Sequence, residues 1–240
     1  MLRFLPPTPT PTSHTQPDVA EAIDRQHRKH IRDVVLPKVV PAGGAQQQLE
    51  AGCTVADLGC GGGNLLVAMA ERFPRSEFHG FEVSDAALAC AARSIAASSV
   101  AAGNTRIHDA NAPGESLGDE GHRDKFDVVM TYDVLHDAPN PVELVAQVRA
   151  ALKPGGVWLL ADIACLSSVR DNVCKLAGAG VYYAFSLNLC MSCALSTEDG
   201  AGLGTLGFTV PVAEKMLGDA GFDQIEVLLE ADNTRWFLAR

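Results

Sequence analysis

The sequence predicts an α/β protein with a seven-stranded, mostly parallel sheet, helices on both faces and an antiparallel last strand. Short apolar runs of strand character alternate with helical segments along the chain. A glycine-rich turn joins the first of these runs to the first long helical segment. The 240 residues, 47% of them hydrophobic and 20% charged, suffice for one domain with a sizeable core. We expect this domain over residues 18–240, after a disordered Pro/Thr-rich tail at 1–17 whose composition cannot bury a core.

The bulk charge limits the classes of partner. The net charge is −10 and the pI about 5.1, whereas nucleic-acid phosphates are bound by clusters of Lys and Arg. Seven cysteines without regular spacing predict reduced thiols and a cytoplasmic protein. Met1–Leu5 is followed by prolines and not by an apolar run, so no secretory signal is expected. The acid-free start before Asp18 leaves organelle targeting as a minor alternative.

The glycine-rich turn predicts a nucleotide-binding site. An apolar run closing on Asp57 leads into Gly59-Cys60-Gly61-Gly62-Gly63 and then into an Ala/Leu-rich helix. Glycines allow a ligand to lie against the backbone and allow positive φ. A phosphate-binding P-loop would need Lys and Ser or Thr after the last glycine, and neither is present. The dinucleotide fingerprint is met only loosely, because Asn64 stands where its third glycine would be, so the glycines alone do not identify the ligand.

The residues around the turn narrow the choice of ligand. Asp57, the glycines and Glu82, about one βαβ unit later, resemble motif I of the class I S-adenosylmethionine-dependent methyltransferases. The resemblance implies a Rossmann-like fold with S-adenosylmethionine as cofactor. It places Asp57 near the methionine end of the cofactor, Glu82 at the ribose hydroxyls and Asp109 at the adenine amino group. The cofactor-binding residues implied are Asp57, Gly59, Gly61, Asn64, Glu82, Val83, Asp109, Ala110 and Asp133.

The elements follow in order along the chain. Helical spacing from Asp18, with Pro37 as a stop, predicts an N-terminal helix that carries His27 and His30, either on a solvated face or toward a ligand. Further elements are a helix from the turn to about Phe73, a strand at Phe78–Glu82, a helix from Ser84 to Ala97, and a strand at Thr105–Asp109 in which His108 packs.

The predicted fourth strand, Phe126–Asp133, should bring titratable groups to the ligand-binding edge of the sheet. Ligands bind at the carboxyl ends of the strands in open parallel sheets. Candidate catalytic residues here are Tyr132, Asp133 and His136. An unperturbed histidine pKa of about 6.5 suits a general base at neutral pH, and Asp133 or Asp137 could orient the ring. The alternative is that His136 caps the helix that starts near Pro139.

The rest of the sheet follows after that helix. The turn Lys153–Gly156, a second feature typical of these methyltransferases, leads into the fifth strand Val157–Asp162. The last elements expected are a helix at Val210–Ala220 and strands at Phe222–Glu230 and Thr234–Ala239, the final one antiparallel.

A long insertion, about 163–208, separates the fifth strand from the last helix. Its stretch Leu176–Leu195 is uncharged and near the length of a membrane span, but glycines and polar residues dilute it, so we expect a helical lid over the acceptor and no membrane association. Substrate-contacting candidates are His27, His30, His136, Tyr182, Tyr183, Asn188 and Cys190. Cys190 and Cys193 have the spacing of a metal or redox pair, but with no second pair we expect packing and no metal.

The sequence Cys-Met-Ser at 190–192 and the loop Gly200–Gly207 resemble a subfamily of small-molecule methyltransferases. That subfamily usually carries an N-terminal winged-helix domain, which we expect to be absent here. Because that domain commonly provides dimerisation, the sequence does not decide between a monomer and a homodimer. The resemblance implies methyl transfer to an O, N or S nucleophile of a small molecule. A non-catalytic S-adenosylmethionine-binding regulator is the alternative. An NAD-linked oxidoreductase is disfavoured by the missing third glycine and the lack of a Tyr-x-x-x-Lys arrangement.

Overall fold

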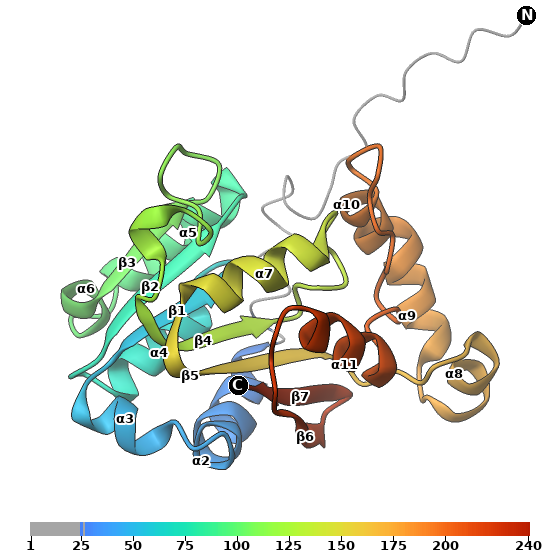
Figure 1. Ribbon diagram of the computed structural model, residues 1–240, viewed down its shortest axis with the longest axis horizontal. Helices are drawn as coiled ribbons and strands as arrows, with labels where there is room; N and C mark the ends of the chain where they lie inside the picture. The colour runs from blue at the N-terminus through green and yellow to red at the C-terminus, as the bar shows by residue number, and fades with distance from the viewer. Residues whose placement is uncertain (1–24, 26) are drawn as a thin grey trace, which may run out of the picture.

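A seven-stranded sheet in the order β3-β2-β1-β4-β5-β7-β6 forms the centre of the protein (Figure 1). The computed structural model describes residue 25 and residues 27–240. The strands are β1 Thr54–Leu58, β2 Glu77–Glu82, β3 Thr105–Asp109, β4 Phe126–Tyr132, β5 Leu152–Ile163, β6 Ile225–Ala231 and β7 Thr234–Ala239. Strands β1 to β5 pair in parallel, and β7 pairs antiparallel with both β5 and β6. The predicted fold class, including the antiparallel last strand, is confirmed.

The strand order reverses between β1 and β4. Strands β2 and β3 extend from one side of β1, and β4 and β5 from the other. In open α/β sheets the crevice at such a switch point, beyond the carboxyl ends of the strands, is where ligands bind. The central strands can line this crevice rigidly because they are buried on both faces, as the burial of Val128, Val129 and Met130 along β4 illustrates.

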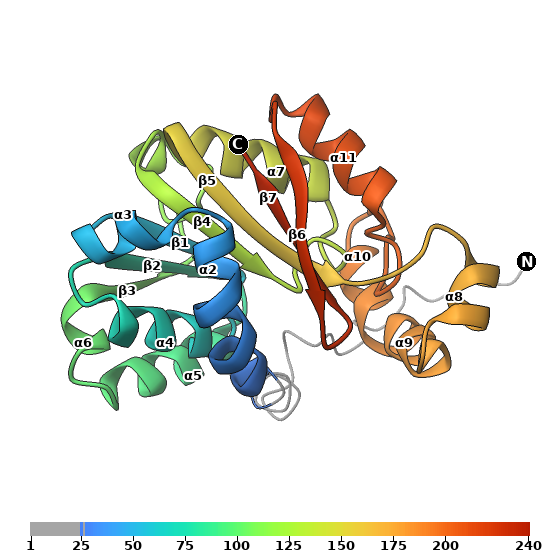
Figure 2. The same ribbon diagram turned by 90° about the horizontal axis from the view of Figure 1, so that it is seen from below.

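Helices cover both faces of the sheet, as Figure 2 shows. One core cluster joins the sheet to η2 Ile31–Val39, α3 Gln46–Ala51, α4 Asn64–Arg72 and α6 Ala101–Asn104. The other joins it to α7 Pro141–Ala151 and α11 Val210–Asp219. Val40 of α2 Val40–Ala42 and Ile95 of α5 Asp85–Ala96 also belong to the first cluster, and the short η3 Glu120–His122 completes this part.

Local capping explains where the helices next to the crevice begin. The Ser84 side chain accepts a hydrogen bond from the backbone N–H of Ala87 at the start of α5, as predicted. Asn140 accepts from the backbone N–H of Glu143 at 3.1 Å, and Pro141 occupies the first turn of α7. The residue that caps α7 is therefore Asn140 and not His136.

The N-terminal helix departs from the prediction. Pro37 was expected to end it, but the chain continues as the π-helix η2 through Val39 and then as α2. In the wider turn the N–H of Val40 donates to the carbonyl of Val35, five residues back. The buried side chains of Val34, Val35 and Val39 supply the packing that outweighs the proline. The predicted tail at 1–17 and the start of this helix at Asp18 lie outside the described residues.

The turn predicted at Lys153–Gly156 lies within β5. Phe126 pairs with Leu152 and Val128 with Val157, so β5 has three more residues than β4 between these two pairs. Gly155 has φ +78° in this excursion. The chain therefore turns where predicted, but regular strand pairing resumes on both sides of the turn.

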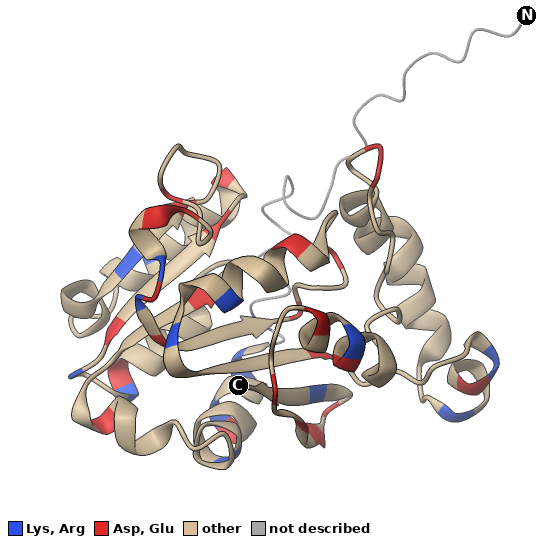
Figure 3. Ribbon diagram, in the orientation of Figure 1, with Lys and Arg blue, Asp and Glu red and all other residues tan. Residues whose placement is uncertain are grey.

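The insertion has one short helix and then an unbroken helical run over residues 179–194, which lies within the stretch Leu176–Leu195 where an apolar helix was expected. It contains α8 Val169–Lys175, α9 Ala179–Phe185, the π-helix η4 Ser186–Cys190 and α10 Met191–Ala194. These helices lie beyond the tips of β4 and β5 (Figures 1 and 2). Figure 3 shows charged residues on α8 and none on α9. Among the described residues no helix has both the length and the apolar character that a membrane crossing requires.

Candidate functional site

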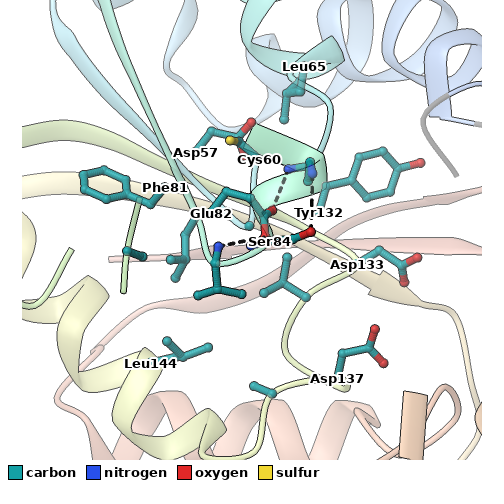
Figure 4. A pocket seen from close by; sticks show the side chains of 18 of the residues that line it. Asp57, Cys60, Leu65, Phe81, Glu82, Ser84, Tyr132, Asp133, Asp137 and Leu144 are labelled. Carbon is teal, nitrogen blue, oxygen red and sulfur yellow. Dashed lines mark hydrogen bonds between the residues drawn. The ribbon is translucent and has the colours of Figure 1, made fainter. Parts of the chain in front are cut away.

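A cavity of about 440 Å³ opens at the switch point of the sheet (Figure 4). Its walls come from the glycine turn after β1, the end of β2, the start of α5 and the segment from β4 into α7. The volume lies within the range of small-molecule pockets. The strand order thus places three predicted site segments around one hollow.

The glycine turn forms the cavity wall nearest to β1. Gly59, Gly61 and Gly63 have φ of +72°, +53° and +80°, a conformation that favours glycine. The N–H groups of Gly59 and Cys60 both donate to the carbonyl of Phe81, which fastens the turn to β2. Asp57, Gly59, Gly61 and Asn64 all line the cavity. Asn64 Oδ1 also accepts a hydrogen bond from Arg28 Nε at 3.1 Å.

Replacement of Gly59 by alanine should perturb both folding and the cavity. A Cβ at Gly59 would meet Cγ2 of Val134 at 2.6 Å, on a backbone with φ +72°. The left-handed conformation alone costs an alanine about 1–2 kcal/mol. We expect a lower midpoint of chemical denaturation and weaker binding of S-adenosylmethionine by calorimetry. Gly121→Ala is the control, since a Cβ there meets nothing within 4 Å. Equal stability of the two variants would contradict this description of the turn.

Glu82 is the polar centre of the turn. It is buried, and its Oε2 accepts from the N–H of Gly61 at 2.9 Å. Its Oε1 accepts from the N–H of Val83 at 2.8 Å and of Ser84 at 2.9 Å. A carboxylate has about four acceptor positions, so these bonds leave capacity for a further donor in the cavity. Figure 4 shows Glu82 between the turn and Ser84.

The end of β3 contributes less to the cavity than expected. Ala110 lines it, as does Val83, but Asp109 is not among the described lining residues. The Asp109 carboxylate accepts from the N–H of Asn111 at 3.0 Å, and Asn111 Nδ2 donates to the carbonyl of Val83 at 2.8 Å. Asp109 therefore shapes the loop beside the cavity in this conformation.

The end of β4 provides the opposite wall. Asp133 has φ +64°, in the left-handed region that aspartate and asparagine adopt more readily than other residues with a side chain. The His27 ring stacks on Tyr132 with centroids 4.2 Å apart, and its Nε2 lies 3.7 Å from Asp133 Oδ2. Burial lowers the pKa of His27 and raises the pKa of Tyr132, so both rings are neutral near pH 7. We call Tyr132, Asp133 and Asp137 the acidic end of the cavity.

His136 lies behind the acidic end and is not among the described lining residues. It is 2% exposed, its Nδ1 donates to Asp162 Oδ1 at 2.8 Å, and its Nε2 lies 3.1 Å from Asp137 Oδ1. Burial opposes its charged form, but the carboxylates of Asp162, Asp133 and Asp137 outweigh burial and raise its pKa well above 6.5. The expectation of an ordinary pKa at His136 is wrong, because three carboxylates hold the ring as an imidazolium.

The remaining predicted substrate residues are spread over two regions. His30 is buried away from the cavity, accepting from Trp236 Nε1 at 3.1 Å, with Nδ1 3.3 Å from Asp232. Tyr182, Tyr183 and Asn188 are not among the described lining residues, and the hydroxyl of Tyr183 accepts from Asn172. Only Cys190 approaches the site: its Sγ, the His136 ring nitrogens and the Asp137 carboxylate offer ligand atoms within 4.8 Å of one another.

Sequence reasoning missed several residues of the site, of which Asp162 and Leu144 are two examples. Asp162, which is 1% exposed, is the main partner of His136. The sequence does contain a signal for Asp162, because this acid ends the apolar run of the fifth strand, just as Asp57 and Glu82 end earlier apolar runs. Leu144 lines the cavity from α7 on the side away from Asp133 and Asp137 (Figure 4), and nothing in its helical pattern distinguishes it from a core residue.

Comparisons with known proteins agree with this geometry. Residues 56–158 match the family described as a methyltransferase domain. The ubiquinone biosynthesis O-methyltransferase of Pseudomonas paraeruginosa is 34% identical over 113 residues, covering 47% of this chain and 45% of that protein. The corresponding enzyme of Leptothrix cholodnii is 31% identical over 121 residues, covering 50% of this chain and 46% of that protein. This chain therefore spans less than half the length of these curated relatives.

Solved structures show the same fold. An O-methyltransferase family protein from Burkholderia thailandensis has a TM-score of 0.62 at 21% identity, covering 97% of this chain and 64% of that chain. Human N-acetylserotonin methyltransferase, in complex with S-adenosylmethionine, has a TM-score of 0.64 at 17% identity, covering 93% and 55%. Residues 56–158 therefore resemble a methyltransferase domain, and the chain shares the fold of solved methyltransferases, one of them in complex with S-adenosylmethionine.

Proposed function

We propose that the protein transfers the methyl group of S-adenosylmethionine to an O, N or S nucleophile of a small molecule. The observation that carries the proposal is a single cavity that joins the glycine turn and Glu82 to the carboxylates at the end of β4. Its fit to the cofactor is supported by the glycine backbone at Gly59 and Gly61, which lines the cavity without side chains, and by the spare acceptor capacity of Glu82.

The cofactor would lie along the glycine turn. Asp57, Gly59, Gly61 and Asn64 would hold its methionine end, Glu82 with Val83 its ribose, and the Asp109–Ala110 loop its adenine. When bound, it supplies a methyl group already activated on a sulfonium. The protein's own task is then to align the nucleophile and to accept a proton where the acceptor carries one.

We assign the acceptor to the acidic end. Asp137 lines the cavity and His136 does not, so we propose Asp137 as the proton acceptor. His136 then acts as a positioning residue, clamped by Asp162 and donating toward Asp137. Tyr132 and Asp133 line the approach. This arrangement differs from the expected one, in which the histidine itself takes the proton.

The insertion is the proposed lid. The N–H of Gly204 donates to the carbonyl of His136 at 3.1 Å, and the N–H of Ala201 to that of Pro139 at 2.9 Å. Cys190 Sγ lies 2.8 Å from Thr205 Oγ1, beside the His136 ring. These contacts couple the insertion to the loop that carries Asp137, so movement of the insertion would open or close the acidic end.

The test is methyl transfer to a panel of small phenols, amines and thiols, followed by S-adenosylhomocysteine release. At least one acceptor should give turnover, and Asp137→Asn should lower kcat about a hundred-fold while S-adenosylmethionine affinity is retained, since general base catalysis contributes about that factor or more. The control is Asp219→Asn, which removes the same single negative charge from an exposed carboxylate that is paired with Lys215. Cofactor binding without turnover of any acceptor would favour the non-catalytic regulator instead.

A further inference from the structure

The charged side chains that line the cavity are of one sign. Its described lining residues include five carboxylates and no lysine or arginine; the carboxylates are Asp57, Glu82, Asp133, Asp137 and Glu143. The nearby Arg28 points its Nε to Asn64 and belongs to a separate hollow, with Arg32 and Arg72. His27, the histidine that lines the cavity, is neutral because burial lowers its pKa. Among the described residues, the charged side chains that line the cavity are therefore all acidic.

Two of these carboxylates gather where the acceptor is proposed to bind. In Figure 4 Asp133 and Asp137 lie on one side of the cavity, away from Phe81 and Leu144. His136 and Asp162 form a neutral pair behind them at 2.8 Å, which leaves two negative charges facing the cavity. Asp133 Oδ1 is buried without a hydrogen-bond partner among the described residues and lies 3.6 Å from His136 Nδ1.

This charge is not balanced by the cofactor alone. S-adenosylmethionine carries one net positive charge, and Asp57 and Glu82 already lie along the part of the cavity proposed for it. A carboxylate or phosphate on the acceptor would face like charge at Asp133 and Asp137, which costs several kcal/mol in a desolvated site.

We propose that the acceptor is a small amine bound in its ammonium form by Asp133 and Asp137. This inference rests on the proposed function and narrows its acceptor to nitrogen. The ammonium gives one proton to the Asp137 carboxylate. The freed lone pair on nitrogen forms the bond to the methyl carbon while the electron pair of the carbon–sulfur bond returns to sulfur. The methylated product again carries one positive charge, and Asp137 passes its proton to solvent.

Three probes of one shape test the proposal. Binding of 2-phenylethylamine, 2-phenylethanol and phenylacetate is measured by calorimetry on the S-adenosylhomocysteine complex at neutral pH. A chelator is present because His136, Asp137 and Cys190 together offer metal-ligand atoms. We expect the amine to bind at least about ten-fold more tightly than the alcohol, and phenylacetate to bind most weakly.

Asp133→Asn and Asp137→Asn should each reduce the preference for the amine about ten-fold. Asparagine at 133 keeps the backbone, because it tolerates the φ of +64°.

The controls separate this inference from the proposed function. Asp219→Asn removes the same charge outside the cavity and should leave the preference unchanged. Equal or tighter binding of the alcohol or phenylacetate, no amine binding to a protein that does bind S-adenosylhomocysteine, or an unchanged preference in both variants would each overturn the amine proposal. Turnover of a phenol but of no amine would overturn it while upholding methyl transfer. Failure to bind S-adenosylhomocysteine at all would instead overturn the proposed function.

Discussion

His136→Ala should lower the free energy of unfolding by about 3–5 kcal/mol, the usual cost of removing one partner from a buried ion pair. The reason is that Asp162, 1% exposed, loses the imidazolium 2.8 Å away and is left as a buried charge. Asp133 and Asp137 lose the same partner. Chemical denaturation of the two proteins at pH 6 gives the difference.

A second substitution distinguishes charge from simple loss of packing. Asp162→Asn in the His136→Ala background removes the buried charge but keeps an oxygen that can accept from the N–H of Ile163. Part of the lost stability should return. A loss below about 1 kcal/mol for His136→Ala, or no recovery in the double variant, would show that the ring is not held as an imidazolium.

The same cluster predicts a pH dependence of stability. Because the pKa of His136 is raised in the folded protein, its contribution to stability is fully present below 6.5, the ordinary histidine value. The contribution is lost as pH rises from there through the raised pKa. The stability difference between wild type and His136→Ala should therefore shrink steadily in denaturation curves above pH 6.5. A difference that grows with pH would contradict the assignment.

Glu82→Gln should weaken S-adenosylmethionine binding about ten-fold to a hundred-fold, although the two side chains have nearly the same shape. The carboxylate accepts from three backbone N–H groups, those of Gly61, Val83 and Ser84. A glutamine must turn its NH2 group toward at least one of them. One lost hydrogen bond to a charged acceptor is worth about 1.5–3 kcal/mol. Calorimetry on Glu82→Gln and on the exposed control Glu226→Gln measures the effect. Equal affinities would remove Glu82 from the site.

Most of the sheet and its ligand-binding edge could be predicted from the sequence, because both depend on local pattern. Apolar runs that alternate with helices predict a parallel sheet covered by helices. The glycine turn at Gly59–Gly63 and the acid Glu82 can be recognised in the sequence. Several glycines after one strand and an acid at the end of the next are typical of a nucleotide-binding turn. Pro37 misled the prediction, since the packing of Val34, Val35 and Val39 overrides a local stop signal.

The chemistry at the acidic end could not be predicted in the same way. A pattern places His136 near the end of β4, but its exposure and pKa depend on Asp162, which comes from another strand 26 residues later in the chain. Cys190 comes from the insertion and reaches His136 only through tertiary packing. The uncharged composition of the insertion suits one apolar helix, and the structure has a continuous helical run there that begins after Gly178 and takes the wider π-helical turn at Ser186–Cys190.

Titration calorimetry of the wild-type protein with S-adenosylmethionine and, separately, with NAD tests the central claim most directly, since both ligands suit a glycine turn followed by an acid. We expect one S-adenosylmethionine per chain, a large loss of affinity in Glu82→Gln, and no comparable binding of NAD. Binding of NAD without binding of S-adenosylmethionine would contradict the assignment of this cavity.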